Sequence, residues 1–391
     1  MNRLSRTLNS LIIAAGLALP GVASAQSAGA PLVAAGPVAP ADQPLIQIAI
    51  LLDTSNSMDG LINQAKSQLW KIVNEFARAK RNGKSPRLEV ALYEYGNDSL
   101  PSAEGHIRQV VSLTTDLDKI SEELFALKTN GGSEFCGQVI DRATAQLPWS
   151  KDKGTLKLIF IAGNEPFTQG PVDYRKAAKG AIESGIVVNT IHCGSDREGV
   201  EGKWKDGAQL ADGQYSFIDS NRQVAHVATP QDDQISKLGE ELNKTYIAYG
   251  RAGSAKKERQ AKQDMNAASV AQGAGVQRAL AKSSAQYKNS DWDLVDAAKD
   301  SGGAALESLA AEELPAEMQK MSKDERKSYV KGMETKREEL QKKIASLNKE
   351  REEYLAKKQK EAAEKGAEDT FDAAVIKAVR SQAAKKAFTF E

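Results

Sequence analysis

The chain has 391 residues, of which 41% are hydrophobic and 27% are charged, and its formal net charge is +1. Without Arg3 and Arg6, which lie in a segment expected to be removed, the charge is near −1 (1 − 2 = −1), which argues against general nucleic-acid binding. No run of about 18 apolar residues follows the N-terminal segment, so we expect no membrane-spanning helix.

The first residues have the pattern of a cleaved export signal. Two arginines precede a short apolar run over 11–23, and the sequence ASA (23–25) is a small-x-small cleavage pattern. Roughly 13 apolar residues interrupted by Pro20 are too few to cross a bilayer, which disfavours a membrane anchor. We therefore expect a signal peptide at 1–25, a flexible leader at 26–42, and export to the periplasm, with secretion as the alternative.

Residues 43–250 alternate short apolar runs with helical patterns. The runs are LIQIAILLD (45–53), RLEVALYEY (87–95), LKLIFIAG (156–163), GIVVNTIHC (185–193) and a weaker GQYSFID (213–219). The helical patterns cover 60–80, 117–128, 135–147, 173–184 and 231–249. Strands that are apolar on both faces and alternate with helices are typical of a mostly parallel sheet covered on both sides. The predicted fold class is therefore α/β, with a doubly wound sheet.

After Gly250 the composition shifts to Ala, Lys, Glu and Gln, and no strand pattern is convincing. The sequence predicts a helical linker region over 251–321, with helix over 256–286, a second helix over 289–300 capped by Ser290, and a break at Pro315. Residues 322–391 are predicted to form a long helix from Ser322 and a last helix after Thr370.

The long helix carries an apolar stripe in which two positions are arginine. The stripe steps by three and four through Val330, Met333, Arg337, Leu340, Ile344, Leu347, Arg351 and Tyr354. This heptad pattern indicates a helical hairpin or coiled coil, whose partner is the tail itself, the α/β domain or a second chain through self-association. A solvated single helix or disorder is the alternative.

The stretch AILLDTSNSMDG (49–60) ends the first apolar run at one carboxylate, Asp53, followed by the hydroxyls of Ser55 and Ser57. Open α/β sheets bind ligands at the carboxyl ends of their strands. One carboxylate and two hydroxyls form an oxygen-only donor set, which suits Mg²⁺, Mn²⁺ or Ca²⁺. An ordinary helix start, with Asp and Ser as capping residues, explains the same local pattern.

At this motif the sequence resembles von Willebrand factor type A domains, whose Asp-x-Ser-x-Ser signature matches DTSNSM (53–58). The resemblance covers about 205 residues and implies a metal-ion-dependent adhesion site with further oxygen ligands from two later loops. The first of these loops reads TNGGSEF (129–135), with Ser133 at the position of the family's Thr. The second reads IAGNEPF (161–167), with Gly163 where the family has Asp.

The resemblance implies a metal set of Asp53, Ser55, Ser57 and Ser133, with Mg²⁺ as the first candidate ion. Because Gly163 removes one carboxylate, neutralising the ion depends on Glu134, on Glu165 or on a ligand's own carboxylate, while Asn164 supplies an uncharged oxygen. We therefore expect a weak or ligand-dependent site. A looser resemblance, carried by GNEPF, NTIHCG and EGKWKDGAQLADGQYSFID, is to uncharacterised exported bacterial proteins with one such domain and a Lys/Glu-rich helical tail.

The two cysteines, Cys136 and Cys193, are each predicted at the rim that contains Asp53. An even pair in an oxidising compartment favours a disulfide, and two free buried thiols are the alternative. A catalytic thiol is disfavoured because the adjacent His192 points to the opposite face of its strand. The other histidines, His106 and His226, do not stand at metal-ligand spacing.

The insert GSDREGVEGKWKDGAQLADG (194–213) is expected to be a surface loop pinned by Trp204, or else a recognition loop beside the metal rim. No phosphate-binding P-loop and no Gly-x-Ser-x-Gly elbow are present. We therefore expect a binding protein of the cell envelope that engages a protein partner through the cation, and not an enzyme. The alternatives are a scaffold whose metal site is degenerate and whose tail binds, and, less favoured, a metal-assisted hydrolase.

Overall fold

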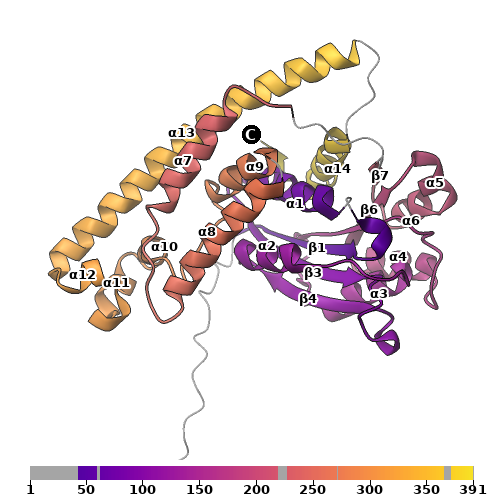
Figure 1. The fold of residues 1–391 in the computed structure, drawn as a ribbon, viewed down its shortest axis with the longest axis horizontal. Coiled ribbons are helices and arrows are strands. Elements are labelled where there is room, and N and C mark those ends of the chain that lie inside the picture. The colour runs from indigo at the N-terminus through magenta and orange to yellow at the C-terminus, as the bar shows by residue number, and fades with distance from the viewer. Residues whose placement is uncertain (1–42, 60–61, 219–226, 271, 365–370, 391) are drawn as a thin grey trace, which may run out of the picture. The chain divides into compact units, whose positions relative to one another are not determined.

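A six-stranded sheet organises the first half of the chain (Figure 1). The computed structural model describes residues 43–59, 62–218, 227–270, 272–364 and 371–390, so the signal peptide and the leader lie outside the described residues. In spatial order the strands are β4 (Ile107–Thr114), β3 (Arg87–Tyr95), β1 (Leu45–Asp53), β5 (Leu156–Gly163), β6 (Ile186–Cys193) and β7 (Tyr215–Ile218). Only β4 is antiparallel to its neighbour within this sheet. The doubly wound α/β class is confirmed.

The strands bury both of their faces because successive side chains alternate between two apolar clusters. In β1, Ile48 and Leu52 belong to one cluster, while Ala49 and Leu51 belong to the other. The first cluster also contains side chains of α1 (Ile62–Ala77), α2 (Leu117–Ala126) and α7 (Asp232–Asn243), and α2 packs directly on β3 and β4. The second is covered by α3 (Cys136–Gln146), α4 (Tyr174–Glu183) and α6 (Trp204–Leu210). Figure 1 shows α1 on one side of the sheet and α3 and α4 on the other.

The insert at 194–213 is helical, where a loop was expected. It forms α5 (Asp196–Glu201) and α6, and Ser195 and Glu198 make a reciprocal capping box at the start of α5. The prediction was wrong because this N-terminal cap and the burial of Trp204, which is 0% exposed, outweigh the several glycines of the segment.

The second half of the chain is helical, as predicted, apart from one short strand. Its elements are α8 (Gly253–Val270), α9 (Gln272–Lys282), α10 (Leu294–Asp300), α11 (Ala304–Ser308), α12 (Ala316–Gln319), α13 (Lys323–Ala363) and α14 (Phe371–Ala384). Strand β8 (Thr389–Phe390), which was not expected, pairs antiparallel with β2 (Ala79–Lys80). The cap of α10 is Asp293, not Ser290, because the Asp293 carboxylate accepts from the backbone of Asp296 at 3.1 Å.

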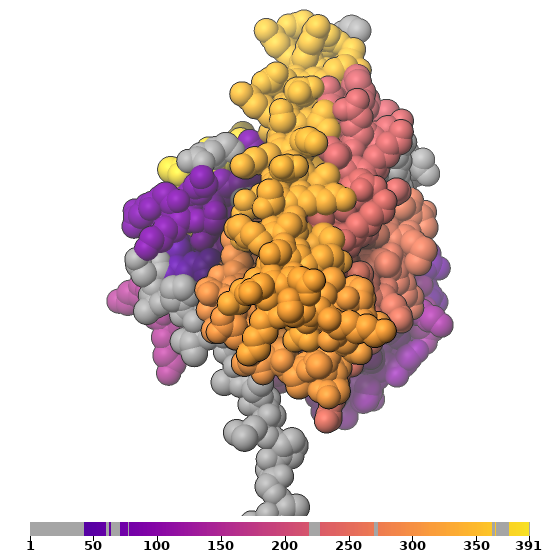
Figure 2. Space-filling view, turned by 90° about the vertical axis from the view of Figure 1, so that its left-hand side faces the viewer, coloured from indigo at the N-terminus to yellow at the C-terminus, as the bar shows by residue number. Residues whose placement is uncertain are grey.

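The apolar stripe of α13 is confirmed, and this chain itself covers it. Val330, Leu340 and Ile344 are buried at 0–6% exposure, and α13 packs along α7 and against α10 and α9. Figure 2 shows α13, in amber, lying along α7, in salmon. Leu340 and Ile344 belong to the same apolar cluster as Ile48 of β1, so the core of the sheet continues into the helical half.

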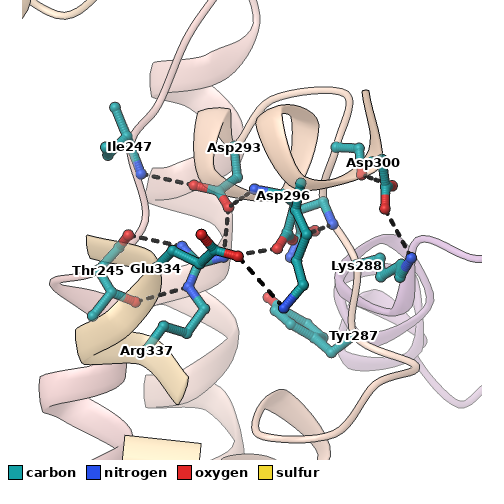
Figure 3. A network of polar contacts seen from close by, with 12 residues as sticks. Thr245, Ile247, Tyr287, Lys288, Asp293, Asp296, Asp300, Glu334 and Arg337 are labelled. Carbon is teal, nitrogen blue, oxygen red and sulfur yellow. Dashed lines mark hydrogen bonds and ion pairs between the residues drawn. The ribbon is translucent and has the colours of Figure 1, made fainter. Parts of the chain in front are cut away.

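The two arginines in the stripe are buried and each pairs with a carboxylate, and Figure 3 shows the contacts of Arg337. Arg337 donates to Asp293 at 2.7 Å, to Asp296 at 2.8 Å and to the backbone oxygen of Thr245 at 2.7 Å. Arg351 donates to Asp232 of α7 at 2.8 Å. A buried guanidinium is tolerated when carboxylates and carbonyls satisfy its donors, so the stripe uses arginine to fix α13 to this chain.

Among the described residues no helix has the length and apolarity to span a bilayer.

Candidate metal-binding site

The signature residues converge at the carboxyl end of β1. Asp53 is the last residue of the strand and is 0% exposed, and its Oδ1 accepts from the backbone of Ser55 at 2.8 Å. The Ser55 and Ser57 hydroxyls are 2.7 Å apart, and Ser57 donates to Asn164 Oδ1 at 3.0 Å. The structure therefore brings together Asp53, Ser55, Ser57 and the auxiliary residue Asn164, which lie in two loops more than a hundred positions apart.

Backbone hydrogen bonds hold these loops in place. Asn56 donates to the carbonyl of Gly131 and Asn130 donates to the carbonyl of Thr54, both at 2.9 Å. Thr54 in turn donates to the carbonyl of Tyr95 at the end of β3, also at 2.9 Å. Donor groups fixed before a ligand arrives lose little conformational freedom when it binds. The rim is thus preorganised by the main chain of three segments.

Glu134 is the second carboxyl of the site. Its side chain is 2% exposed and lies within hydrogen-bonding contact of Asp53. Burial and the negative charge of Asp53 raise the pKa of Glu134 to about 9, and burial raises the pKa of Asp53. The predicted ligand Ser133 is half-buried, and no hydrogen bond joins it to another described residue.

A glycine at the end of β3 makes room for this carboxyl pair. Gly96 has φ +77°, and a Cβ there would lie 2.6 Å from Asp53 Oδ1 and 2.8 Å from Glu134 Cγ. Both the backbone conformation and the lack of space therefore require glycine at this position. No sequence motif marked Gly96, and the only signal for it was its position directly after a predicted strand.

The Asp53 carboxylate is also the place where a cation fits. Its Oδ2 is buried and has no hydrogen-bond partner among the described residues. A buried unpaired acceptor is costly, and two adjacent carboxylates need a proton or a cation between them. Carboxylate and hydroxyl oxygens are the donors that Mg²⁺ and Ca²⁺ prefer, so the residues present fit a hard divalent ion. Within the described ranges, no group of three or more His, Cys, Asp or Glu side chains is placed so that it could hold a metal ion.

Space explains the glycine at position 163. A Cβ on Gly163 would overlap the hydroxyl of Tyr95 and would lie 3.0 Å from Asp53 Oδ2. The Tyr95 hydroxyl is held there because it donates to the carbonyl of Ala162 at 2.9 Å. The φ of Gly163 is not positive, so volume and not backbone strain excludes a side chain. Tyr95 thus occupies the place that the expected aspartate would take.

The Glu165 carboxylate is engaged by a side chain of its own loop. Its carboxylate accepts from Gln169 at 3.3 Å, and its backbone oxygen accepts from Trp204 Nε1 at 2.8 Å. Trp204 also packs against Phe167, and the backbone of Phe167 donates to the carbonyl of Gly202 at 2.8 Å. The insert therefore clamps the loop that carries Asn164, and its tryptophan is not available to an outside partner.

The predicted disulfide is not formed, and Cys136 and Cys193 are both buried free thiols. Cys136 belongs to the apolar cluster beneath α3, whereas Cys193 belongs to the cluster on the opposite face of the sheet. Both residues lie at the predicted rim, but the sheet separates their side chains. Burial raises the pKa of each thiol, which disfavours the nucleophilic thiolate.

His192 is buried at the end of β6, at 2% exposure, and neither of its ring nitrogens has a hydrogen-bond partner among the described residues. It packs against Trp204 with ring centroids 5.7 Å apart. Burial lowers its pKa from 6.5, and the carboxylates of Glu198 and Asp196 offset part of that effect. His106 Nδ1 lies 3.7 Å from Asp98 Oδ1, and His226 falls outside the described residues.

Comparison with known proteins agrees with this fold. Residues 47–226 match the family model described as von Willebrand factor type A domain, and no curated protein matches the chain. One similar solved structure is the conserved hypothetical protein BatB from Bacteroides thetaiotaomicron, with 20% identity, a TM-score of 0.34, and coverage of 44% of this chain and 90% of that chain. Another is the SpRpn10 VWA domain, with 16% identity, a TM-score of 0.36, and coverage of 46% and 91%. A third is proximal thread matrix protein 1 from the mussel byssus, with a zinc-occupied MIDAS motif, 12% identity, a TM-score of 0.35, and coverage of 46% and 43%.

Proposed function

Because residues 47–226 match the family model of the von Willebrand factor type A domain, we propose that this chain is a protein-binding module that engages its partner through a divalent cation. The observation that carries the proposal is the grouping of Ser55 and Ser57, whose hydroxyls contact each other, beside Asp53, whose Oδ2 is buried and has no hydrogen-bond partner among the described residues. Mg²⁺ is the proposed ion, with Mn²⁺ and Ca²⁺ as alternatives. A divalent ion bound there would supply a positive charge that coordinates an oxygen atom of the partner.

The exposed part of the insert supports a role in selecting the partner. Trp204 is buried, so recognition falls to the outer face of α5, where the Val200 side chain is 41% exposed. A single exposed apolar side chain is ordinary on a protein surface, so this part of the proposal rests on the contact of the insert with the loop that carries Asn164. We propose that this face of α5 contacts the partner next to the cation.

A scaffold whose tail does the binding is the competing function. It is less favoured because the apolar stripe of α13 is covered by α7 and α10 of the same chain. We also propose that the chain is not an enzyme, because His192 has no hydrogen-bond partner among the described residues and both thiols have raised pKa values. Export to the periplasm remains a proposal that rests on the sequence of residues 1–25.

Metal titration of the chain without its signal peptide tests the proposal. Mg²⁺, Mn²⁺ and Ca²⁺ are added to the wild type, to Asp53→Ala and to the control Asp59→Ala, whose exposed side chain lies in the same loop. Binding at about 100 times Kd should stabilise the wild type and the control by about 2.7 kcal/mol, seen as a higher melting temperature. The shift should vanish in Asp53→Ala. No calorimetric signal and no melting shift in the wild type with any of the three ions would refute the cation site.

A further inference from the structure

Asp53 and Glu134 present two carboxyls to each other inside the protein. They are 0% and 2% exposed, and no lysine or arginine of the described residues contributes to the charge around either of them. Buried carboxylates are normally paired with a cationic group or bound to a metal. A carboxyl pair with no cationic side chain therefore needs its positive charge from elsewhere.

Glu134, and not a residue at position 163, is the acidic residue beside Asp53. The acidic residue expected at 163 has no room, because its Cβ would overlap the Tyr95 hydroxyl. Glu134 contacts the Asp53 carboxylate next to Gly96, where the absence of a Cβ leaves the space for it. The site therefore contains two carboxyls, and the second one comes from the loop before α3 instead of from the end of β5.

A second carboxylate changes the net charge of the bound ion together with its ligands. One carboxylate leaves a divalent ion with a net charge of +1, and such a site depends on an acidic partner. Two carboxylates neutralise the ion within the chain, and hydroxyls such as those of Ser55 and Ser57 complete a hard-ion donor set without adding charge.

We propose that Glu134 supplies the second carboxylate of the cation site in place of an acidic residue at 163, so that the ion binds this chain without a partner's carboxylate. This inference rests on the proposed function and specifies which residues hold the ion and what the partner need not provide. It also predicts that the oxygen a partner adds to the ion can be uncharged.

Calorimetry with MnCl₂ and MgCl₂ alone, without any partner, tests the inference on wild type, Glu134→Gln and Glu165→Gln. Glu165 is the matched control, since it is a neighbouring acid whose carboxylate accepts from Gln169. The wild type should bind, Glu165→Gln should stay within about threefold of it, and Glu134→Gln should bind at least about tenfold more weakly, the lower end of losses seen around metal sites. Equal binding by wild type and Glu134→Gln would overturn the inference and leave the cation site standing, whereas no binding by the wild type would refute the cation site itself.

The refuting outcome of a second measurement depends on the wild type alone. Wild type and Asp53→Ala are labelled with glutamate carrying a ¹³C side-chain carboxyl, and infrared difference spectra are recorded as Mg²⁺ is added. A glutamate carboxylate band should shift in the wild type and not in Asp53→Ala. An unchanged glutamate region in the wild type at saturating Mg²⁺ would contradict a role for Glu134 as a ligand.

Discussion

Gly163→Asp restores the residue that the family motif leads one to expect, and it should destabilise the protein. The new Cβ would overlap the Tyr95 hydroxyl and would lie 3.0 Å from Asp53 Oδ2 and 3.1 Å from the Trp204 ring. Overpacking of this kind costs about 1–3 kcal/mol. Burying a further unpaired carboxyl adds about 1–3 kcal/mol. Together these effects lower the free energy of unfolding by roughly 2–6 kcal/mol.

Tyr95→Phe separates the two contributions. Alone it removes the hydrogen bond to the Ala162 carbonyl and should cost about 1 kcal/mol. In the double variant the hydroxyl that opposes the new side chain is gone, so the total loss should fall short of the sum of the single losses by about 1–2 kcal/mol. The assay is urea unfolding followed by far-ultraviolet circular dichroism at pH 7 with a chelator present. A Gly163→Asp variant as stable as the wild type, or strict additivity in the cycle, would refute the steric account of Gly163.

Two further predictions follow from buried charged and ionisable groups. Because burial holds the pKa of folded His192 below its ordinary value of 6.5, the unfolded chain binds the extra proton first, and the free energy of unfolding should decrease as pH falls below about 6.5. His192→Gln should flatten this decrease between pH 7.5 and 5, and an unchanged slope would contradict the assignment. Arg337→Met leaves the buried Asp293 carboxylate without its arginine partner and should lower the free energy of unfolding, measured in urea, by about 3–5 kcal/mol. Lys299→Met, which removes an ion pair whose lysine is 57% exposed, should cost less than about 1 kcal/mol, and equal losses would argue against the burial argument.

The sequence predicted the elements that bury apolar residues on both faces. The runs that became β1, β3, β5 and β6 are rich in apolar residues, above all Val, Ile, Leu, Ala and the aromatic residues, so their positions follow from composition. Strand β4 was missed because it lies at the edge of the sheet and is only partly buried, which weakens its hydrophobic pattern. Edge strands carry less of the apolar signal on which such predictions depend.

The site was predictable only in part, because its missing pieces come from distant parts of the chain. Asp53, Ser55 and Ser57 belong to one short motif, whereas the choice of Glu134 over Glu165 depends on Gly96 at the end of another strand. Local spacing contains no information about which loop has room beside a carboxylate. The disulfide prediction failed for a related reason, since it placed two residues on the same rim without resolving on which face of the sheet each one lies.

The pairing of β2 with β8 has a consequence for the order in which the chain folds. Thr389 donates to the carbonyl of Lys80, which lies 309 positions earlier in the sequence, and Phe388 is buried in the same apolar cluster as β1. Contacts between residues so far apart form only after the intervening chain has been made, and they slow folding because a long loop must close first. Because this pairing and the burial of Phe388 complete the core, a chain in which residues 388–390 cannot yet reach β2 remains short of its native state.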